Sequence, residues 1–122
     1  MALRESAKIK NLPIQLKGIV NPDIDIGIPG GTTLVKFASA IVGMDLPELT
    51  RARGILVNSL GIDALVASSV IAGNFSRNDR IADATGIPLE AEFLEQSSNF
   101  RAELGFNDFL SARNSLGAPS NP

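Results

Sequence analysis

The longest helical pattern of this chain runs from Asp63 to Gly86, with the sequence DALVASSVIAGNFSRNDRIADATG. Its first half has apolar or small residues on every side, which is typical of a helix that is buried all round. Its second half is amphipathic and carries the charged residues. The stretch is too long for an ordinary strand, because strands rarely exceed about ten residues. The sequence therefore predicts a central, buried helix over residues 63–86.

Local signals mark both ends of this helix. Asp63 is suited to the N-cap position, because its carboxylate can accept hydrogen bonds from the amides of the first turn. Gly86 can adopt the left-handed conformation that ends helices, and it is followed by the apolar Ile87 and by Pro88, which cannot continue a helix. The same kinds of signal define the other elements.

Four further helices are predicted. Thr32 or Thr33 caps a short helix that Gly43 ends, and the capping-box pattern from Asp45 to Glu48 opens a helix that Gly61 ends. Pro88 begins another helix, which ends before Gly105, and a short helix follows it. The five predicted helices cover residues 34–42, 46–60, 63–86, 88–104 and 107–116.

The chain shows no sustained strand alternation, so the predicted fold class is all-α: a compact bundle of about five helices around the central helix. We expect an N-terminal arm and ordered loop over residues 1–33, a helical domain over 34–116 and a disordered tail over 117–122. The length of 122 residues fits a single domain of this kind.

Composition removes many kinds of chemistry. The chain contains no cysteine and no histidine, so disulfides, thiolate chemistry, imidazole catalysis and ordinary zinc sites are excluded. Carboxylates, lysine, arginine, hydroxyls and backbone amides are what remains for catalysis. We therefore lean towards a protein that is not an enzyme, with no cofactor, no metal and no catalytic residue.

The charge balance also restricts the partners. The formal net charge is only −2, so no strong field attracts the chain to nucleic acid or to an anionic membrane. No apolar run approaches the roughly 20 residues that span a bilayer, and the N-terminus lacks the apolar core of a signal peptide. We expect a cytoplasmic protein without nucleic-acid or membrane partners.

Two loops contain residues that could bind ions. Free amides at the start of a helix, near Gly30, Gly31, Thr32 and Thr33, could hold a phosphate or carboxylate with help from Lys36. The alternative is a plain turn, since the spacing is not that of a P-loop. Asp23 and Asp25 could offer oxygen ligands to a divalent cation, but two carboxylates without further ligands make a weak site.

Polar residues of the central helix form a second candidate site. Arg80 and Asp83 are three residues apart and can pair on one helix face. Asp83 also lies near the helix C-terminus, where the macrodipole disfavours a negative charge, so a compensating partner is expected. A salt bridge that fixes a neighbouring helix or subunit is the favoured interpretation. The alternative is a pocket for an acidic ligand, lined by Asn74, Arg77 and Arg80.

The run NFSRNDRIADATGIPLE, residues 74–90, resembles the distal helix and turn of the carboxymuconolactone decarboxylase and alkylhydroperoxidase-like family. LVKFA, LPELTRAR and GIDALVASSVIAGNF fit the preceding elements of that family, so the resemblance covers about residues 34–93. It implies an all-helical fold that assembles into dimers, trimers or hexamers. The family's peroxidases use a CxxC pair with a histidine and a carboxylate, and its decarboxylases also use histidine. This chain has neither residue type, so no catalytic residue is carried over.

These observations favour a non-catalytic helical domain that forms homo-oligomers or binds a partner. Small residues of the central helix would permit close helix approach, namely Ala67, Ser68, Ala72 and Gly73. One alternative is a subunit or remnant of a family hydroperoxidase or decarboxylase that acts with a partner supplying cysteine and histidine. The other alternative is a binder of a small acidic ligand.

Overall fold

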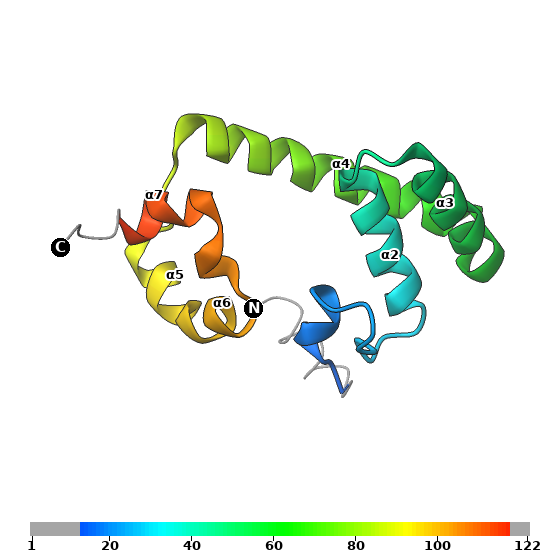
Figure 1. Cartoon of the computed structure of the whole chain (residues 1–122), viewed down its shortest axis with the longest axis horizontal. Helices are drawn as coiled ribbons and strands as arrows, with labels where there is room; N and C mark the ends of the chain where they lie inside the picture. The colour runs from blue at the N-terminus through cyan, green and yellow to red at the C-terminus, as the bar shows by residue number, and fades with distance from the viewer. Residues whose placement is uncertain (1–12, 118–122) are drawn as a thin grey trace. The chain divides into compact units, whose positions relative to one another are not determined.

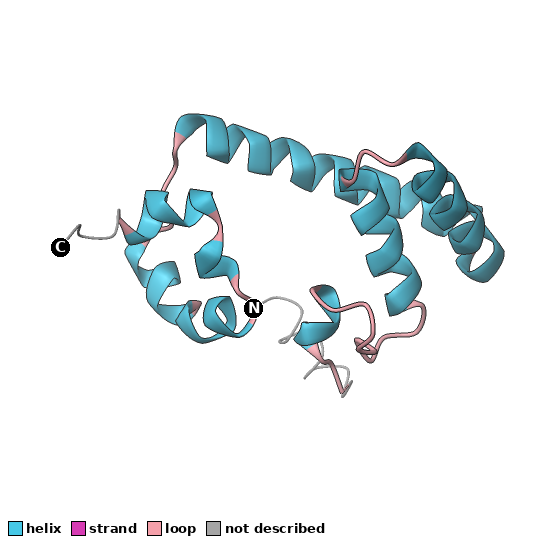
Figure 2. Cartoon of the chain, in the orientation of Figure 1, coloured by secondary structure: helices cyan, strands magenta, loops and turns pink. Residues whose placement is uncertain are grey.

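The computed structural model describes residues 13–117, which form helices and connecting loops without a strand in that range (Figure 2). The predicted all-α class is confirmed for this part of the chain. The chain divides into two compact units, Met1–Arg77 and Asn78–Pro122. The division falls within its longest helix, which is labelled α4 in Figure 1. The predicted N-terminal arm lies largely outside the described residues, and so does all but the first residue of the predicted tail.

The first unit is built on a pair of packed helices, α2 (Gly31–Val42) and α3 (Leu46–Leu60), preceded by the 3₁₀ helix η1 (Leu16–Ile19). Its core consists of Phe37 and Ala40 from α2 with Ala52 and Leu56 from α3. Leu56 has no exposed surface, and Ala52 lies one turn before it on the same side of α3. This side of α3 therefore faces the core.

The boundaries of α3 follow from its sequence. The Asp45 carboxylate accepts a hydrogen bond from the Glu48 amide at 3.0 Å, as the capping pattern predicts. At the other end, the Gly61 amide donates to the Val57 carbonyl, and Gly61 has a φ of 89°, which favours glycine. Both predicted caps of this helix are confirmed.

The start of α2 differs from the prediction. Gly30, rather than Thr32 or Thr33, occupies the N-cap position, with a φ of 72° and no side-chain cap. A Cβ atom at Gly30 would lie 2.8 Å from Leu60 Cδ2, and one at Gly31 would overlap the Ile26 side chain. The close packing at both positions accounts for the glycines there.

The longest helix, α4, spans Ile62–Thr85, within one residue of the prediction at each end. Asp63 lies in its first turn rather than at the N-cap. The prediction that this helix is buried is wrong for the single chain, because α4 has no buried residue. The physical reason is that only one side of its first half packs, with Leu65 against the core of the first unit.

The second unit contains α5 (Ala91–Gln96), α6 (Ser98–Glu103), η2 (Phe106–Asp108), η3 (Leu110–Ala112) and α7 (Arg113–Leu116). The continuous helix predicted for 88–104 is interrupted at Ser97, whose backbone angles of −90° and −6° depart from helical values. This helix also begins late, at Ala91, and the Leu89 amide before it donates to Ser115 Oγ at 2.7 Å.

The predicted helix over 107–116 is likewise wrong in its continuity. Phe109 has an extended backbone, with a ψ of 144°, which separates η2 from η3 and α7. Ser97 is fully buried, and its hydroxyl accepts a hydrogen bond from Arg101 Nε. The short helices are thus connected by side-chain hydrogen bonds rather than by one regular backbone ladder. Across residues 13–117, none of the helices has the length and apolar character that spanning a membrane requires.

Candidate functional site

The first half of α4 has two different sides. Towards its own unit it presents Leu65 and a series of small, half-buried residues, Ser68, Ala72 and Ser76. Away from that side it presents five large apolar residues, which we call the outer face of α4: Ile62, Val66, Val70, Ile71 and Phe75. These side chains are between 57% and 66% exposed. The helix therefore contacts its own unit through small side chains and leaves the large ones uncovered.

The spacing of the outer face follows helix geometry. Ile62, Val66 and Val70 recur every four residues and form one stripe, while Ile71 and Phe75 form a neighbouring stripe with the same spacing. No acidic or basic residue stands within the segment from Ala64 to Ser76. The result is an exposed apolar surface of two stripes within the first unit, of the kind that marks an interaction site.

The predicted ligand residues Asn74 and Arg77 lie at the end of this surface. Arg77 Nη2 donates to Asn74 Oδ1 at 2.8 Å, so the structure brings these two residues together. The bond lies between residues three apart on one exposed helix face, and it holds the guanidinium along the helix. This bond occupies one of the five N–H donors of the Arg77 guanidinium and the acceptor oxygen of Asn74.

The other predicted pair, Arg80 and Asp83, is not brought together. Within the described residues no ion pair joins the two side chains, although both lie on α4. Elsewhere in the described residues, an ion pair joins Arg51 to Glu48 at 2.6 Å. Asp83 instead lines a groove of the second unit.

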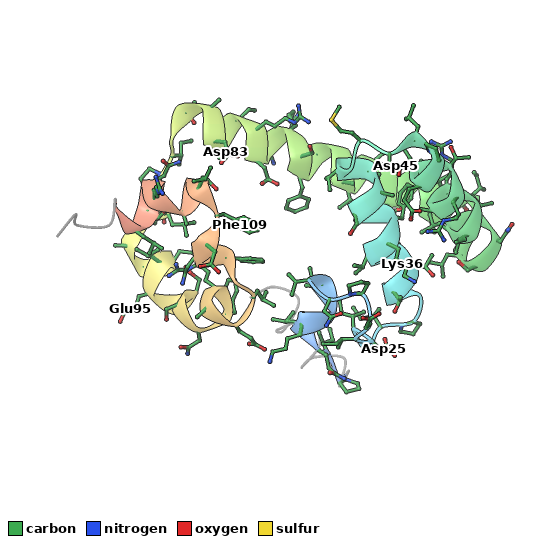
Figure 3. The ribbon with its side chains drawn as sticks, viewed as in Figure 1. Asp25, Lys36, Asp45, Asp83, Glu95 and Phe109 are labelled. Atoms are coloured by element: carbon green, nitrogen blue, oxygen red, sulfur yellow. The ribbon has the colours of Figure 1, made fainter. Side chains whose placement is uncertain are left out.

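Each residue of the predicted anion site has a structural role of its own. The Gly31 amide donates to the Ile28 carbonyl at 2.8 Å, and Gly30 packs against Leu60. Lys36 lies on α2 (Figure 3). It lines a hollow of about 360 Å³ together with Glu48 and Arg51. Thr32 and Thr33 lie within the first turn of α2, and neither caps it. The glycine pair is thus explained by its packing.

The aspartates considered as cation ligands stabilise a loop. Asp25 Oδ1 accepts a hydrogen bond from the Gly27 amide at 3.0 Å, which is a local turn motif. The Asp23 amide in turn donates to Asn21 Oδ1. Among residues 13–117, no group of three or more acidic side chains could hold a metal ion.

Sequence reasoning placed the residues of the outer face on the correct helix but in the interior. The breadth of this apolar surface, which exceeds what the neighbouring helices can cover, is also the reason for the homo-oligomer predicted from the sequence. Comparison of the chain with models of protein families, with curated proteins and with solved structures finds no match. The resemblance to the carboxymuconolactone decarboxylase and alkylhydroperoxidase-like family accordingly stays a prediction.

Proposed function

We propose that this protein is a non-catalytic helical module that self-associates through the outer face of α4. The observation that carries the proposal is the exposure of five large apolar side chains on a helix without a buried residue. Burying one such side chain completely stabilises a complex by about 1.5–3 kcal/mol. An apolar face of this size therefore favours association over exposure to water.

A second copy of the chain is the partner that fits this face best. In a twofold dimer each chain contributes the same surface, so the five apolar side chains are covered by five more. At roughly 1 kcal/mol for the exposed part of each side chain, the ten together offset an association cost of about 4–15 kcal/mol. With a partner that has no apolar face of its own, only the five side chains of this chain would be buried, and the stabilising free energy would be half as large. Gly73, on the same helix, has no atom of its own chain near its Cβ position and leaves room for close approach.

The family resemblance is consistent with this proposal, because its members assemble through packed helices. An alkylhydroperoxidase-like arrangement of the assembled helices, and a cytoplasmic location, belong to the same proposal. The catalytic alternative requires a second chain that supplies cysteine and histidine, and no contact of the described residues favours it.

The experiment that tests the proposal is sedimentation equilibrium over a wide range of concentrations. The wild-type chain should show a mass at least twice that of the 12.8 kDa monomer, falling on dilution. Val70→Glu puts a charge on the outer face and should yield a monomer with an unchanged helical circular dichroism spectrum. Asn58→Glu is the matched control, because it adds the same charge at an exposed position of α3. A monomeric wild type, or equal effects of the two variants, would refute self-association through α4.

A further inference from the structure

A groove of about 550 Å³ lies entirely within the second unit. The last turns of α4 form one side of it, and the segment from η2 to α7 forms another, with Asp83 and Phe109 among the residues that line it (Figure 3). Its apolar lining includes Ile87, Leu89, Phe109 and Leu116, all of which are exposed. The ring of Phe109 contacts that of Phe106, with 6.0 Å between their centroids, which holds it in place. The volume is within the range of about 300–1,000 Å³ that is typical of ligand-binding clefts.

Three polar side chains of the groove, Arg101, Asn107 and Ser115, already have hydrogen-bond partners in their own unit. Arg101 donates from Nε to Ser97 Oγ, from Nη1 to Asn107 Oδ1 and from Nη2 to the Leu94 carbonyl, at 2.7–2.9 Å. Ser115 Oγ accepts from the Leu89 amide. The cation of the groove is thus held by neutral groups, and it neutralises neither carboxylate.

Asp79 and Asp83 are different. They lie one turn apart on α4, and within the described residues neither carboxylate has a hydrogen-bond or ion-pair partner. Two like charges at this spacing repel each other, and both lie in the last two turns of α4, where the helix dipole disfavours negative charge. A cation placed at this edge of the groove would relieve both effects.

The charge of the whole second unit has the same sign. Residues 78–117 carry seven acidic residues and three arginines, which gives a formal charge of −4. The acidic residues are Asp79, Asp83, Glu90, Glu92, Glu95, Glu103 and Asp108, and the basic residues are Arg80, Arg101 and Arg113. A field of this sign steers cationic partners towards the unit.

We propose that this groove binds a basic, amphipathic segment of another protein. Its apolar side chains would enter between Leu89, Phe109 and Leu116, and a lysine or arginine next to them would pair with Asp79 and Asp83. Apolar contact supplies most of the affinity in such a site, and the carboxylates select the sign of the partner's charge. This surface belongs to the second unit, so the proposal does not depend on self-association through the first half of α4.

The test uses the full chain and a short, fluorescently labelled peptide of leucine and lysine with helical apolar spacing. A peptide with glutamate at every lysine position is its control. Anisotropy titrations at low salt should show binding of the lysine peptide and at least about tenfold weaker binding of the glutamate peptide. The double variant Asp79→Asn/Asp83→Asn should weaken the lysine peptide about fivefold. Glu92→Gln/Glu95→Gln, which removes the same charge from α5 outside the groove, should change it less than twofold.

Phe109→Ala gives a second variant that leaves both carboxylates in place, and it should weaken the lysine peptide as well. Amide NMR shifts on peptide addition should concentrate at the groove residues. If Asp79→Asn/Asp83→Asn and Glu92→Gln/Glu95→Gln weakened binding of the lysine peptide equally, the effect would come from the net charge of the protein. That result would overturn the proposal. Equal binding of both peptides, or shifts confined to the first unit, would do the same. A peptide of residues 1–17 that binds in place of the lysine peptide with the same dependence on Asp79 and Asp83 would make this chain itself the occupant, against the proposal.

Discussion

At the scale of single residues, Gly54 is a glycine that the fold does not require. It lies inside α3, its φ is not in the left-handed region, and a Cβ atom there would meet nothing within 4 Å. Glycine destabilises a helix interior by about 0.5–1 kcal/mol relative to alanine. Gly54→Ala should therefore raise the free energy of unfolding by about that amount in urea titrations. A decrease would show that α3 is contacted at this position by a neighbour, such as a second chain.

Gly30 is the contrasting case, because its φ is 72° and a Cβ atom would lie 2.8 Å from Leu60 Cδ2. Gly30→Ala should lower the free energy of unfolding by about 1 kcal/mol or more, through backbone strain and this contact. The same urea titration measures it. An unchanged free energy of unfolding would contradict this structural explanation of Gly30. The predicted anion site would then be the remaining explanation for a glycine at this position.

The side chain of Asp45 caps α3 by accepting from the Glu48 amide. Asp45→Ala removes this bond and should lower the free energy of unfolding by about 1 kcal/mol. Asp45→Asn is the matched control, since its amide oxygen can accept the same hydrogen bond, and it should retain most of the stability. Chemical denaturation of the three proteins compares them. Equal losses in both variants would assign the effect to the charge rather than to the cap.

At the scale of the element, α4 combines an apolar outer face with a glycine in its interior. Gly73 follows Val70 by three residues and Val66 by seven, so it lies on the same stripe, and a Cβ atom there meets nothing within 4 Å. Gly73→Leu should keep or increase helicity in the single chain. It should weaken self-association by about 1–3 kcal/mol, because a bulky side chain overfills a close helix contact. Sedimentation velocity measures the association, and an unchanged or higher association constant would mean that the helices do not approach each other at Gly73.

At the scale of the whole molecule, the absence of cysteine and histidine from the sequence makes a chemical prediction. The purified chain should not reduce an alkyl hydroperoxide with a dithiol, because that reaction requires a thiolate nucleophile. It should not turn over a lactone substrate through histidine either. Both assays are direct. Turnover above background that disappears in Asp83→Asn would demonstrate a carboxylate-based site and would contradict the non-catalytic proposal.

The sequence by itself determined the helices that depend on local interactions. The ends of α3 follow from Asp45 and Gly61, and those of α4 lie within one residue of the prediction because Gly86 and Pro88 stop a helix wherever it is placed. Caps of this kind involve atoms a few residues apart. The sequence alone therefore carries all of the information that these boundaries need.

Only the tertiary structure decided which surfaces are covered. The apolar composition of α4 predicts that other residues bury its side chains. It does not tell whether those residues belong to the same chain or to another one, since burial depends on elements distant in the sequence. The segment before α5 likewise forms a hydrogen bond over a long sequence distance, from the Leu89 amide to Ser115 Oγ, 26 residues apart. The groove of Asp83 and Phe109 is assembled from such separated segments. Contacts of this range depend on how the chain folds back on itself, and helical periodicity and capping signals do not encode that.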